Sequence, residues 1–336
     1  MVIAKKSYSP PSRLYGFVRA RQLEGTFPGD RGTGVWPITA WRIRWGWGEP
    51  PEEAWQYETS IWPPTEPIGI DVLAGKNLGL RYQRVRSLFE CKLVLANYSP
   101  VVVSLDITKG WYNAPKGRIP DRRRGELTVG AHTVTLTGYD DSRHQLKFIN
   151  SWGSDWGDKG YGYLSYRTFE QTLCEGWFSY FAGPKQNRSG PEPGLKERMW
   201  GAREFGGGIF HVREIVGPNE DRIGWAFAIQ RANSLDVEEL FVKPERRRKG
   251  FGKALVQLLS QLSSEVQQEP RVWISYPDTT PENLLFLEKL LGPVGLQLRE
   301  SPIRWAPFVF CSINDKLEPV TLHLPNPKQP KRQRPE

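Results

Sequence analysis

Short apolar runs separated by polar turns dominate the second half of the chain. Runs of strand length cover residues 209–216, 223–230, 235–242, 271–276 and 305–313. Apolar residues recur every three or four positions over 252–266, and a second helical segment covers 282–291. This order of strands and helices predicts an α+β domain with a mixed α/β sheet over residues 197–314.

The rest of the chain differs in composition. Residues 1–183 are rich in Trp, Gly and Pro, which predicts a loop-rich first domain. Residues 184–196 carry almost nothing apolar and are interpreted as a linker between two domains. Residues 315–336 are rich in Pro, Lys and Arg, which predicts a disordered basic tail. A length of 336 residues fits two domains of ordinary size.

The net charge of +9 raises the question of a nucleic-acid partner. Much of the excess charge lies in short basic runs at 122–124, 246–249 and 328–334. Runs of this kind are typical of solvated loops and tails, and no nucleic-acid-binding motif accompanies them. We therefore do not expect nucleic acid to be a partner.

Cysteine usage and hydropathy bear on the cellular compartment. Cys91, Cys174 and Cys311 are too few and too dispersed for a disulfide framework, which favours a reducing cytoplasm. The N-terminus lacks an apolar core of signal-peptide length, and no stretch is long enough to span a bilayer. We predict a cytoplasmic protein with no membrane partner and no metal; the sequence does not predict its oligomeric state.

The densest motif lies between residues 130 and 166. It reads Gly-Ala-His132-Thr-Val-Thr-Leu-Thr-Gly-Tyr, then Phe-Ile-Asn150-Ser-Trp152-Gly, then Trp-Gly and Gly-Tyr-Gly. This closely resembles the C-terminal half of papain-like cysteine peptidases, and the resemblance extends over about residues 10–180. It implies a two-lobed fold in which His132 is the general base, Asn150 orients its ring and Trp152 shields the pair from water.

The same resemblance shows that the nucleophile is missing. The family has a cysteine just before a tryptophan at the start of its central helix, and here Val35 precedes Trp36. Valine has neither an acidic proton nor a lone pair, so papain-type covalent catalysis cannot occur at this position. The upstream glutamine that donates to the oxyanion in the family is missing as well. We interpret the domain as a pseudopeptidase whose groove binds a peptide; the alternative is a purely structural remnant.

Other thiols and hydroxyls of the first domain are poorer candidates for a nucleophile. Cys91 lies on a helix that is remote from the cleft in the family, and Cys174 follows the last motif strand, so both are expected to be ordinary buried thiols. Thr33 and Thr39 are hydroxyls near the expected place, but a threonine nucleophile usually uses its own N-terminal amine as base. A peptidase with a displaced nucleophile remains the third hypothesis for function.

The segment 235–255 resembles the core motif of GNAT acyltransferases, in which a strand leads through Arg/Gln-x-x-Gly-x-Gly/Ala into a helix. Here the motif is Arg247-x-x-Gly250-x-Gly252. Its glycines let the backbone approach a pyrophosphate, and the helix presents the positive end of its dipole to the phosphates. The resemblance implies acetyl-CoA or another acyl-CoA as cofactor. The residues expected to bind it are Phe241, Val242, Arg247, Arg248, Lys249, Gly250, Phe251, Gly252, Lys253 and Asn283.

The acid and the base of the transfer are less defined by the sequence. Glu239 matches an acidic position of the family that can deprotonate the acceptor amine, although an exposed charge or an ion-pair partner is an equal alternative. Glu238 is expected on the opposite face of a regular strand. Phe286 or Leu287 stands where many relatives carry a tyrosine that acts as general acid for the departing thiolate. Tyr276 is the candidate to take over this role.

Two functions lead from these motifs. The first is an acyl-CoA-dependent N-acyltransferase whose papain-like groove binds the acceptor. The second is a non-catalytic binding or scaffold protein that keeps CoA as a ligand. The sequence does not distinguish a small amine, a protein lysine or an N-terminal amine as acceptor.

Overall fold

The computed structural model describes residues 9–58, 60–79, 81–180, 185–189, 196–205, 208–301, 306–312 and 315. The chain divides into two compact units. The first contains Met1–Asn187 and Val216–Ile223, and the second contains Arg188–Ile215 and Gly224–Glu336.

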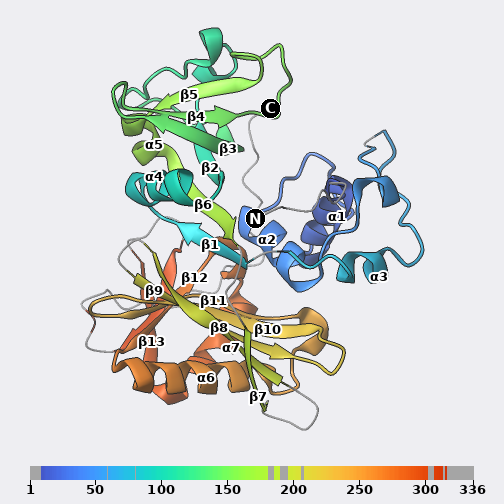
Figure 1. Cartoon of the computed structure of the whole chain (residues 1–336), viewed down its shortest axis with the longest axis vertical. Coiled ribbons are helices and arrows are strands. Elements are labelled where there is room, and N and C mark those ends of the chain that lie inside the picture. Colours follow the sequence, from blue (N-terminus) through green and yellow to red (C-terminus); the bar gives the residue numbers. More distant parts are fainter. Residues whose placement is uncertain are drawn as a thin grey trace, which may run out of the picture. The chain divides into compact units, whose positions relative to one another are not determined.

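The N-terminal part of the first unit is helical (Figure 1). Its helices are α1 (Arg13–Leu23), α2 (Pro37–Gly46), α3 (Ile70–Gly75) and the 3-10 turn η1 (Glu52–Ala54). Ser12 caps α1, because its Oγ accepts the N–H of Tyr15 at 3.1 Å. The helices bury a common core that includes Leu14, Val18 and Ile43.

A six-stranded sheet forms the rest of the first unit, in the order β1-β6-β2-β3-β4-β5. The strands are β1 (Arg81–Val85), β2 (Val101–Ile107), β3 (Gly130–Asp140), β4 (Gln145–Ile149), β5 (Tyr161–Ser165) and β6 (Leu173–Tyr180). The helices are α4 (Leu88–Asn97) and α5 (Tyr166–Thr172), with 3-10 turns η2 (Lys109–Trp111) and η3 (Pro115–Gly117). Every neighbouring pair of strands is antiparallel. Each strand therefore alternates its side chains between two faces, which matters for the site on β3.

The second unit is built on an eight-stranded sheet in the order β13-β14-β12-β11-β10-β9-β8-β7. The strands are β7 (Lys185–Ser189), β8 (Lys196–Phe205), β9 (Gly208–Val216), β10 (Arg222–Gln230), β11 (Leu235–Val242), β12 (Pro270–Ile274), β13 (Leu296–Glu300) and β14 (Phe308–Ser312). The helices are α6 (Phe251–Val266) and α7 (Pro281–Leu291), with 3-10 turns η4 (Pro244–Arg246), η5 (Tyr276–Asp278) and η6 (Gly292–Val294). Strands β11 and β12 are parallel and α6 connects them, which forms a βαβ unit.

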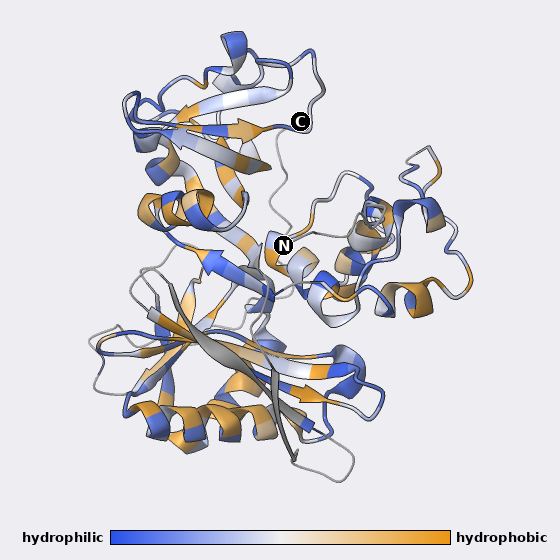
Figure 2. Ribbon diagram, viewed as in Figure 1, coloured by the Kyte–Doolittle hydropathy of each residue, from blue (hydrophilic) through white to orange (hydrophobic). Residues whose placement is uncertain are grey.

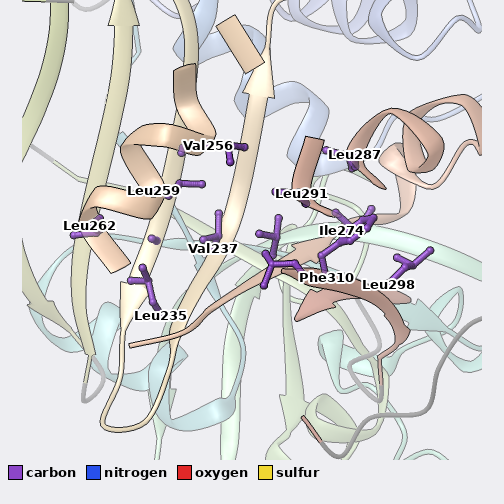
Figure 3. Packing of buried hydrophobic residues seen from close by; sticks show 14 of the residues in the cluster. Leu235, Val237, Val256, Leu259, Leu262, Ile274, Leu287, Leu291, Leu298 and Phe310 are labelled. Carbon is purple, nitrogen blue, oxygen red and sulfur yellow. The ribbon is translucent and has the colours of Figure 1, made fainter. Parts of the chain in front are cut away.

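One apolar core joins α6 and α7 to this sheet (Figure 3). Leu235 and Val237 of β11 face Val256 and Leu259 of α6 across it. Both apolar and polar residues occur along α6 in Figure 2, as expected for a helix with one buried face. This packing holds α6 against β11.

The predicted fold class is confirmed: an α+β part with an antiparallel sheet precedes a part with a mixed α/β sheet. The predicted helices over 252–266 and 282–291 and the strand over 235–242 match α6, α7 and β11 within a residue at each end. Strands β8 and β13 were missed because their sequences are rich in charged residues. Within the expected linker, Lys185–Ser189 forms β7. Except for Asp315, the expected tail lies outside the described residues.

Membrane-spanning helices and clusters of metal ligands are absent from the described residues. None of the helices there has the length and apolar character needed to cross a bilayer. Nor does that part of the chain bring three or more His, Cys, Asp or Glu side chains together as a metal site.

Candidate functional sites

The imidazole of His132 and the amide of Asn150 form a hydrogen-bonded pair. His132 lies on β3, and Asn150 directly follows the end of neighbouring β4. Nε2 of His132 is 2.8 Å from Oδ1 of Asn150. An amide oxygen can only accept, so Nε2 carries the hydrogen and Nδ1 is left for another partner. The two residues predicted to be the base and its orienting group are thus brought together.

Aromatic rings enclose this pair. The His132 ring stacks on Trp152 with centroids 4.7 Å apart, and Trp152 stacks on Tyr112 at 5.5 Å. Trp111 meets the His132 ring edge-on at 6.3 Å. Burial lowers the pKa of His132, although the hydrogen bond to Asn150 acts in the opposite direction. Trp152 thus stacks on the imidazole, and its role in shielding the pair stays a prediction.

The thiols of the first unit are badly placed to act with His132. Cys91 is fully buried in α4, and burial raises the pKa of its thiol. Cys174 donates to Asp106 Oδ1 at 3.3 Å. Leu105 is the cross-strand partner of His132, so the adjacent Asp106 points to the opposite face of the sheet, together with the Cys174 thiol.

A hydroxyl in α2 and the thiol of the second unit are buried as well. Thr39 is buried within α2, and Cys311 is buried in β14 of the second unit. Burial raises the pKa of Cys311 to about 11. Val35 lies just before α2, and its side chain packs on the apolar core of the helical part. Trp36 is the N-cap of α2 and is 42% exposed.

Glu24 is a residue of this region that the sequence interpretation missed. It is the C-cap of α1, and its Oε1 accepts the backbone N–H of Trp36 at 2.9 Å. The ends of α1 and α2 are thereby tied together by a carboxylate. The two residues are 12 positions apart in the chain, so no local sequence pattern predicts this contact. The only sign of it in the sequence is that Trp36, at the start of the helix, has no side chain that could cap the helix itself.

In the second unit, the loop between β11 and α6 has a backbone shape suited to an anion. Arg248 has φ 60° and Gly250 has φ 85°, both in the left-handed region. A Cβ added at Gly250 would meet no atom within 4 Å, so the space above this residue is open. Gly250 is also the N-cap of α6. Glycine is favoured there because its backbone adopts this conformation without strain.

The donors of this loop are available. Among the residues that the structure describes, the backbone N–H groups of residues 248–253 donate to no acceptor. The first N–H to do so is that of Ala254, which reaches Gly250 O at 3.1 Å. Consecutive free N–H groups at a helix N-terminus form a cradle for an anion such as a phosphate.

The basic side chains of the loop divide into two kinds. The guanidinium of Arg247 donates through Nε to Val242 O at 3.1 Å and lies 5.7 Å from the centroid of Phe241. Arg248, Lys249 and Lys253 are exposed. Arg247 thus shapes the loop, whereas the other three are available to a ligand. Phe251 is buried at the start of α6, beside the partly buried Gly252.

A β-bulge changes the direction of the glutamates on β11. Ala228 pairs with Val237 and Phe227 pairs with Glu239, so Glu238 is the extra residue. Val237 and Leu240 both pack on the α6 core. Their neighbours Glu238 and Glu239 therefore both point away from it, and the prediction that they take opposite faces is wrong because the strand is not regular. Glu239 is only 3% exposed, which excludes the exposed-charge alternative.

Strands β11 and β12 separate beyond the bulge. Their pairing runs only from Leu235 with Pro270 to Val237 with Val272, although β11 continues to Val242 and β12 to Ile274. The strand register between β11 and β12 thus ends at Val237, before either strand ends. The free N–H groups at the start of α6 follow β11 in the chain, beyond the point where this register ends.

The remaining predicted residues have mixed outcomes. The Asn283 amide Nδ2 donates to Asp278 O at 2.8 Å, so this side chain stabilises the turn before α7. Leu287 is buried in the core of the unit, and Phe286 is 46% exposed. Tyr276 begins η5, and its side chain lies outside the described residues. Its role as acid stays a prediction.

Comparisons with protein families agree with both motifs. Residues 80–176 match the papain family cysteine protease model. Residues 173–292 match the acetyltransferase (GNAT) family model. The resemblance predicted from the sequence is therefore confirmed in both parts of the chain.

Individual proteins show the same two likenesses. An uncharacterised peptidase C1-like protein of Acanthamoeba polyphaga mimivirus is 26% identical over 181 residues, which are 47% of this chain and 54% of that protein. The chain thus spans about half the length of that relative. Xylellain, a cysteine protease from Xylella fastidiosa, is 23% identical with a TM-score of 0.47, over 52% of this chain and 70% of its own. An N-acetyltransferase from Thermoplasma acidophilum in complex with coenzyme A is 17% identical with a TM-score of 0.26, over 31% and 60%.

Proposed function

We propose that this protein, in which a papain-family segment precedes a GNAT-family segment, is an acyl-CoA-dependent N-acyltransferase with acetyl-CoA as its first candidate donor. The observation that carries the proposal is the loop before α6. It combines free N–H groups at residues 248–253 with two left-handed residues and exposed basic side chains. A neutral or acidic loop would not attract a pyrophosphate, and backbone N–H groups that already donate to other acceptors could not bind one.

The residues of the second unit suit a CoA thioester. The N–H groups of the loop would hold its pyrophosphate, with Arg248 and Lys249 adding charge. The region beyond Val237, where the register of β11 and β12 ends, would receive the arm that follows. When bound, the thioester supplies an activated acyl carbon for attack by an amine.

Glu239 is our candidate for the base of this transfer. An ammonium cannot attack a carbonyl carbon until it loses a proton, and a carboxylate can accept that proton directly or through water. Glu239 lies on the sheet face away from α6, next to the point where β11 and β12 part. We expect Glu239→Gln to lower turnover while acetyl-CoA binding is kept.

The first unit would bind the acceptor. Its His132–Asn150 pair is hydrogen-bonded and contacts aromatic rings, while the position of the nucleophile holds valine. A groove that held extended peptides can still bind them without the chemistry. We therefore favour a peptide or protein amine over a small amine as acceptor.

A second candidate function is a binding protein that keeps CoA without turning it over. Leu287 favours it, because this residue is buried in the core at a position where many GNAT relatives carry a tyrosine that acts as general acid. The same loop would bind CoA in both cases. Only turnover with an acceptor separates the two functions.

The test is calorimetric titration with acetyl-CoA of three proteins: the natural chain, Gly250→Glu and Gly295→Glu. Gly295 is a matched control, because it also has a left-handed backbone (φ 86°) with nothing within 4 Å of an added Cβ. Micromolar binding that is lost in Gly250→Glu and kept in Gly295→Glu supports the site. Absence of binding by the natural chain contradicts it. Release of free thiol with a panel of amines and peptides then separates the enzyme from the binding protein.

A further inference from the structure

The boundary of the first compact unit does not follow the boundaries of the two family segments. The GNAT-matching segment covers residues 173–292, yet Val216–Ile223, well inside that segment, belongs to the first unit. These residues form the turn between β9 and β10 together with the strand ends on either side. The first unit therefore contains a piece of GNAT-family sequence as part of its own compact body.

Arg222, the first residue of β10, joins this turn to the end of α2. Its Cζ lies 3.7 Å from the centroid of the Trp45 ring, and its Nη1 donates to Trp45 O at 2.5 Å. Trp45 is the penultimate residue of α2, so its carbonyl is one of those that a helix end leaves without an intrahelical donor. The N–H of Glu49, four residues further on, donates to Asn77 O instead. An arginine from a distant part of the chain thus caps this helix.

The turn that precedes Arg222 is tight. The N–H of Gly217 donates to Asp221 O at 2.8 Å, and the N–H of Glu220 donates to Gly217 O at 3.0 Å. A Cβ added at Gly217 would lie 2.2 Å from Oδ1 of Asp221, so the Asp221 carboxylate occupies space that only a glycine leaves open. The backbone of Glu220 is left-handed, with φ 63°. These bonds return the chain at once into β10 and present Arg222 at its start.

On its other side, Trp45 contacts the sheet of the first unit. Its ring meets Tyr82 of β1 edge-on with centroids 6.3 Å apart, and Tyr82 meets Trp177 of β6 at 5.8 Å. Cζ of Arg84 lies 3.9 Å from the centroid of Trp177. Each of these side chains, like that of Arg222, is 4% exposed or less. A continuous buried row of aromatic and guanidinium groups therefore runs from the turn to the first sheet.

Beyond Arg222, β10 continues directly into the ladder of the second sheet. Gly224 pairs with Val242, and Trp225 pairs with Phe241. Arg222 is thus only two residues from the first of these pairs. Release of Arg222 from Trp45 would free the end of the strand on which the β10–β11 ladder begins.

We propose that the first unit is the folding partner of the GNAT-family segment, and that Trp45 with the end of α2 is its docking surface. This surface fits a guanidinium held on a tight turn, because it combines an aromatic face with a carbonyl at the negative end of a helix. Its occupant is the chain's own turn, residues 217–222. The papain-family and GNAT-family segments then unfold as one. This role needs neither a nucleophile nor acyl-CoA, so it does not rest on the proposed acyltransferase activity.

The experiment is hydrogen exchange of the full chain, read by mass spectrometry at increasing denaturant concentration and without ligand. Peptides from β2 and β3 report on the first unit, and peptides from α6 and β11 report on the second. In the natural chain we expect both sets to lose protection at the same denaturant concentration. Arg222→Met keeps most of the side-chain length but has no charge and no donor. In this variant the two transitions should separate, and the α2 peptides should exchange about 10- to 100-fold faster in the absence of denaturant.

Arg231→Met is the matched control. Arg231 directly follows the other end of β10 and donates through Nε to Asp236 Oδ2 at 3.1 Å within the second unit. Its replacement also removes a partly buried arginine, but it should keep the common transition and the slow exchange of α2.

Three outcomes overturn the proposal. The first is two separate transitions in the natural chain, a result that needs no variant. The second is an Arg222→Met protein that behaves like Arg231→Met. The third covers an Arg222→Met protein that does not fold: Arg222→Lys keeps the charge but not the planar group that stacks on Trp45. Exchange of α2 should then still be faster than in the natural chain, and equal exchange contradicts the role of the guanidinium.

Discussion

Oδ1 of Asn150 lies 2.8 Å from Nε2 of His132 and also 2.8 Å from the backbone nitrogen of Ser151. The second contact is a hydrogen bond donated by the Ser151 N–H, which fixes the amide with its oxygen toward the imidazole. The His132 tautomer follows from it. The pair has the hydrogen bond that the resemblance implies for a base and its orienting group, although Val35 stands where the family has its cysteine.

The pKa of His132 tests this arrangement. Its value is lowered from 6.5 by burial, and the hydrogen bond to Asn150 partly opposes the change. Asn150→Ala removes the bond, so the pKa should fall further. Asn150→Asp is the control with a negative charge and should raise the pKa above that of the natural protein. Histidine resonances followed by NMR from pH 4 to pH 8 measure both; identical titration in Asn150→Ala contradicts the bond.

The same group links stability to pH. The pKa of His132 is lower in the folded than in the unfolded state, so the unfolded state binds more protons just below pH 6.5. The His132 contribution to stability is therefore present above pH 6.5 and is lost as pH falls toward the folded pKa. His132→Phe should flatten the fall of the unfolding free energy between pH 6.5 and pH 5. An unchanged slope in chemical denaturation contradicts the assignment.

Glu90 should show the opposite dependence. It accepts the N–H of Arg86 at 2.8 Å near the start of α4, and burial raises its pKa from 4.5 to about 7. The folded state then holds a proton between these values that the unfolded state releases. The associated stability is present below pH 4.5 and is lost as pH rises through about 7.

Glu90→Gln keeps an acceptor for Arg86 without a buried charge. We expect the variant to be more stable than the natural protein by about 1 to 2 kcal/mol at pH 8 and equally stable at pH 4.5. Glu170→Gln, on the exposed surface of α5, is the matched control and should change little at either pH. Thermal unfolding at both pH values decides, and a destabilised Glu90→Gln at pH 8 would show that the carboxylate is needed as a charged cap.

Two glycines of the first sheet should respond differently to a methyl group. A Cβ at Gly162 of β5 would lie 2.2 Å from Cζ of Phe148, its cross-strand partner. A Cβ at Gly138 of β3 would meet nothing within 4 Å. Gly162→Ala should therefore destabilise the protein by about 3 kcal/mol, whereas Gly138→Ala should change the unfolding free energy by less than about 1 kcal/mol. Equal unfolding midpoints in denaturant would contradict the packing around Phe148.

Local pattern explains which parts of this fold could be predicted. Leu255, Leu259 and Leu262 repeat at helical spacing and bury one face of α6, so its position followed from the sequence. Strand β8 could not be found in this way, because Lys196–Phe205 carries charged residues along most of its length. The wrong face given to Glu238 has a related cause: a bulge depends on cross-strand register, which one strand does not encode.

The candidate sites divide in the same manner. His132, Asn150 and Gly250 belong to motifs of fixed spacing, and each lies where its motif places it. Glu24 belongs to no motif, and its contact with Trp36 depends on how α1 and α2 meet. Tertiary contacts of this kind are set by packing of the whole lobe, so the sequence alone gives no local sign of them.

The basic loop of the second unit allows a last prediction about acetyl-CoA binding. Arg247 is held by Val242 O and Phe241, so Arg247→Ala removes short-range contacts that shape the loop. Arg248 and Lys249 are exposed and would act on the phosphates through charge. Arg248→Ala or Lys249→Ala should weaken binding about 3- to 10-fold in 50 mM salt and far less in 500 mM salt, because ions screen exposed charges. The weakening by Arg247→Ala should persist at both salt concentrations.

Calorimetry with two ligands separates these effects. Acetyl-pantetheine lacks the pyrophosphate and is the control ligand, since its weaker binding should not change in Arg248→Ala or Lys249→Ala. If both ligands lose affinity equally in these variants, the loop charges act on the fold of the site and the phosphate assignment is wrong. If Arg247→Ala also recovers at high salt, its guanidinium faces the phosphates, and the contact with Val242 O is not retained in the complex.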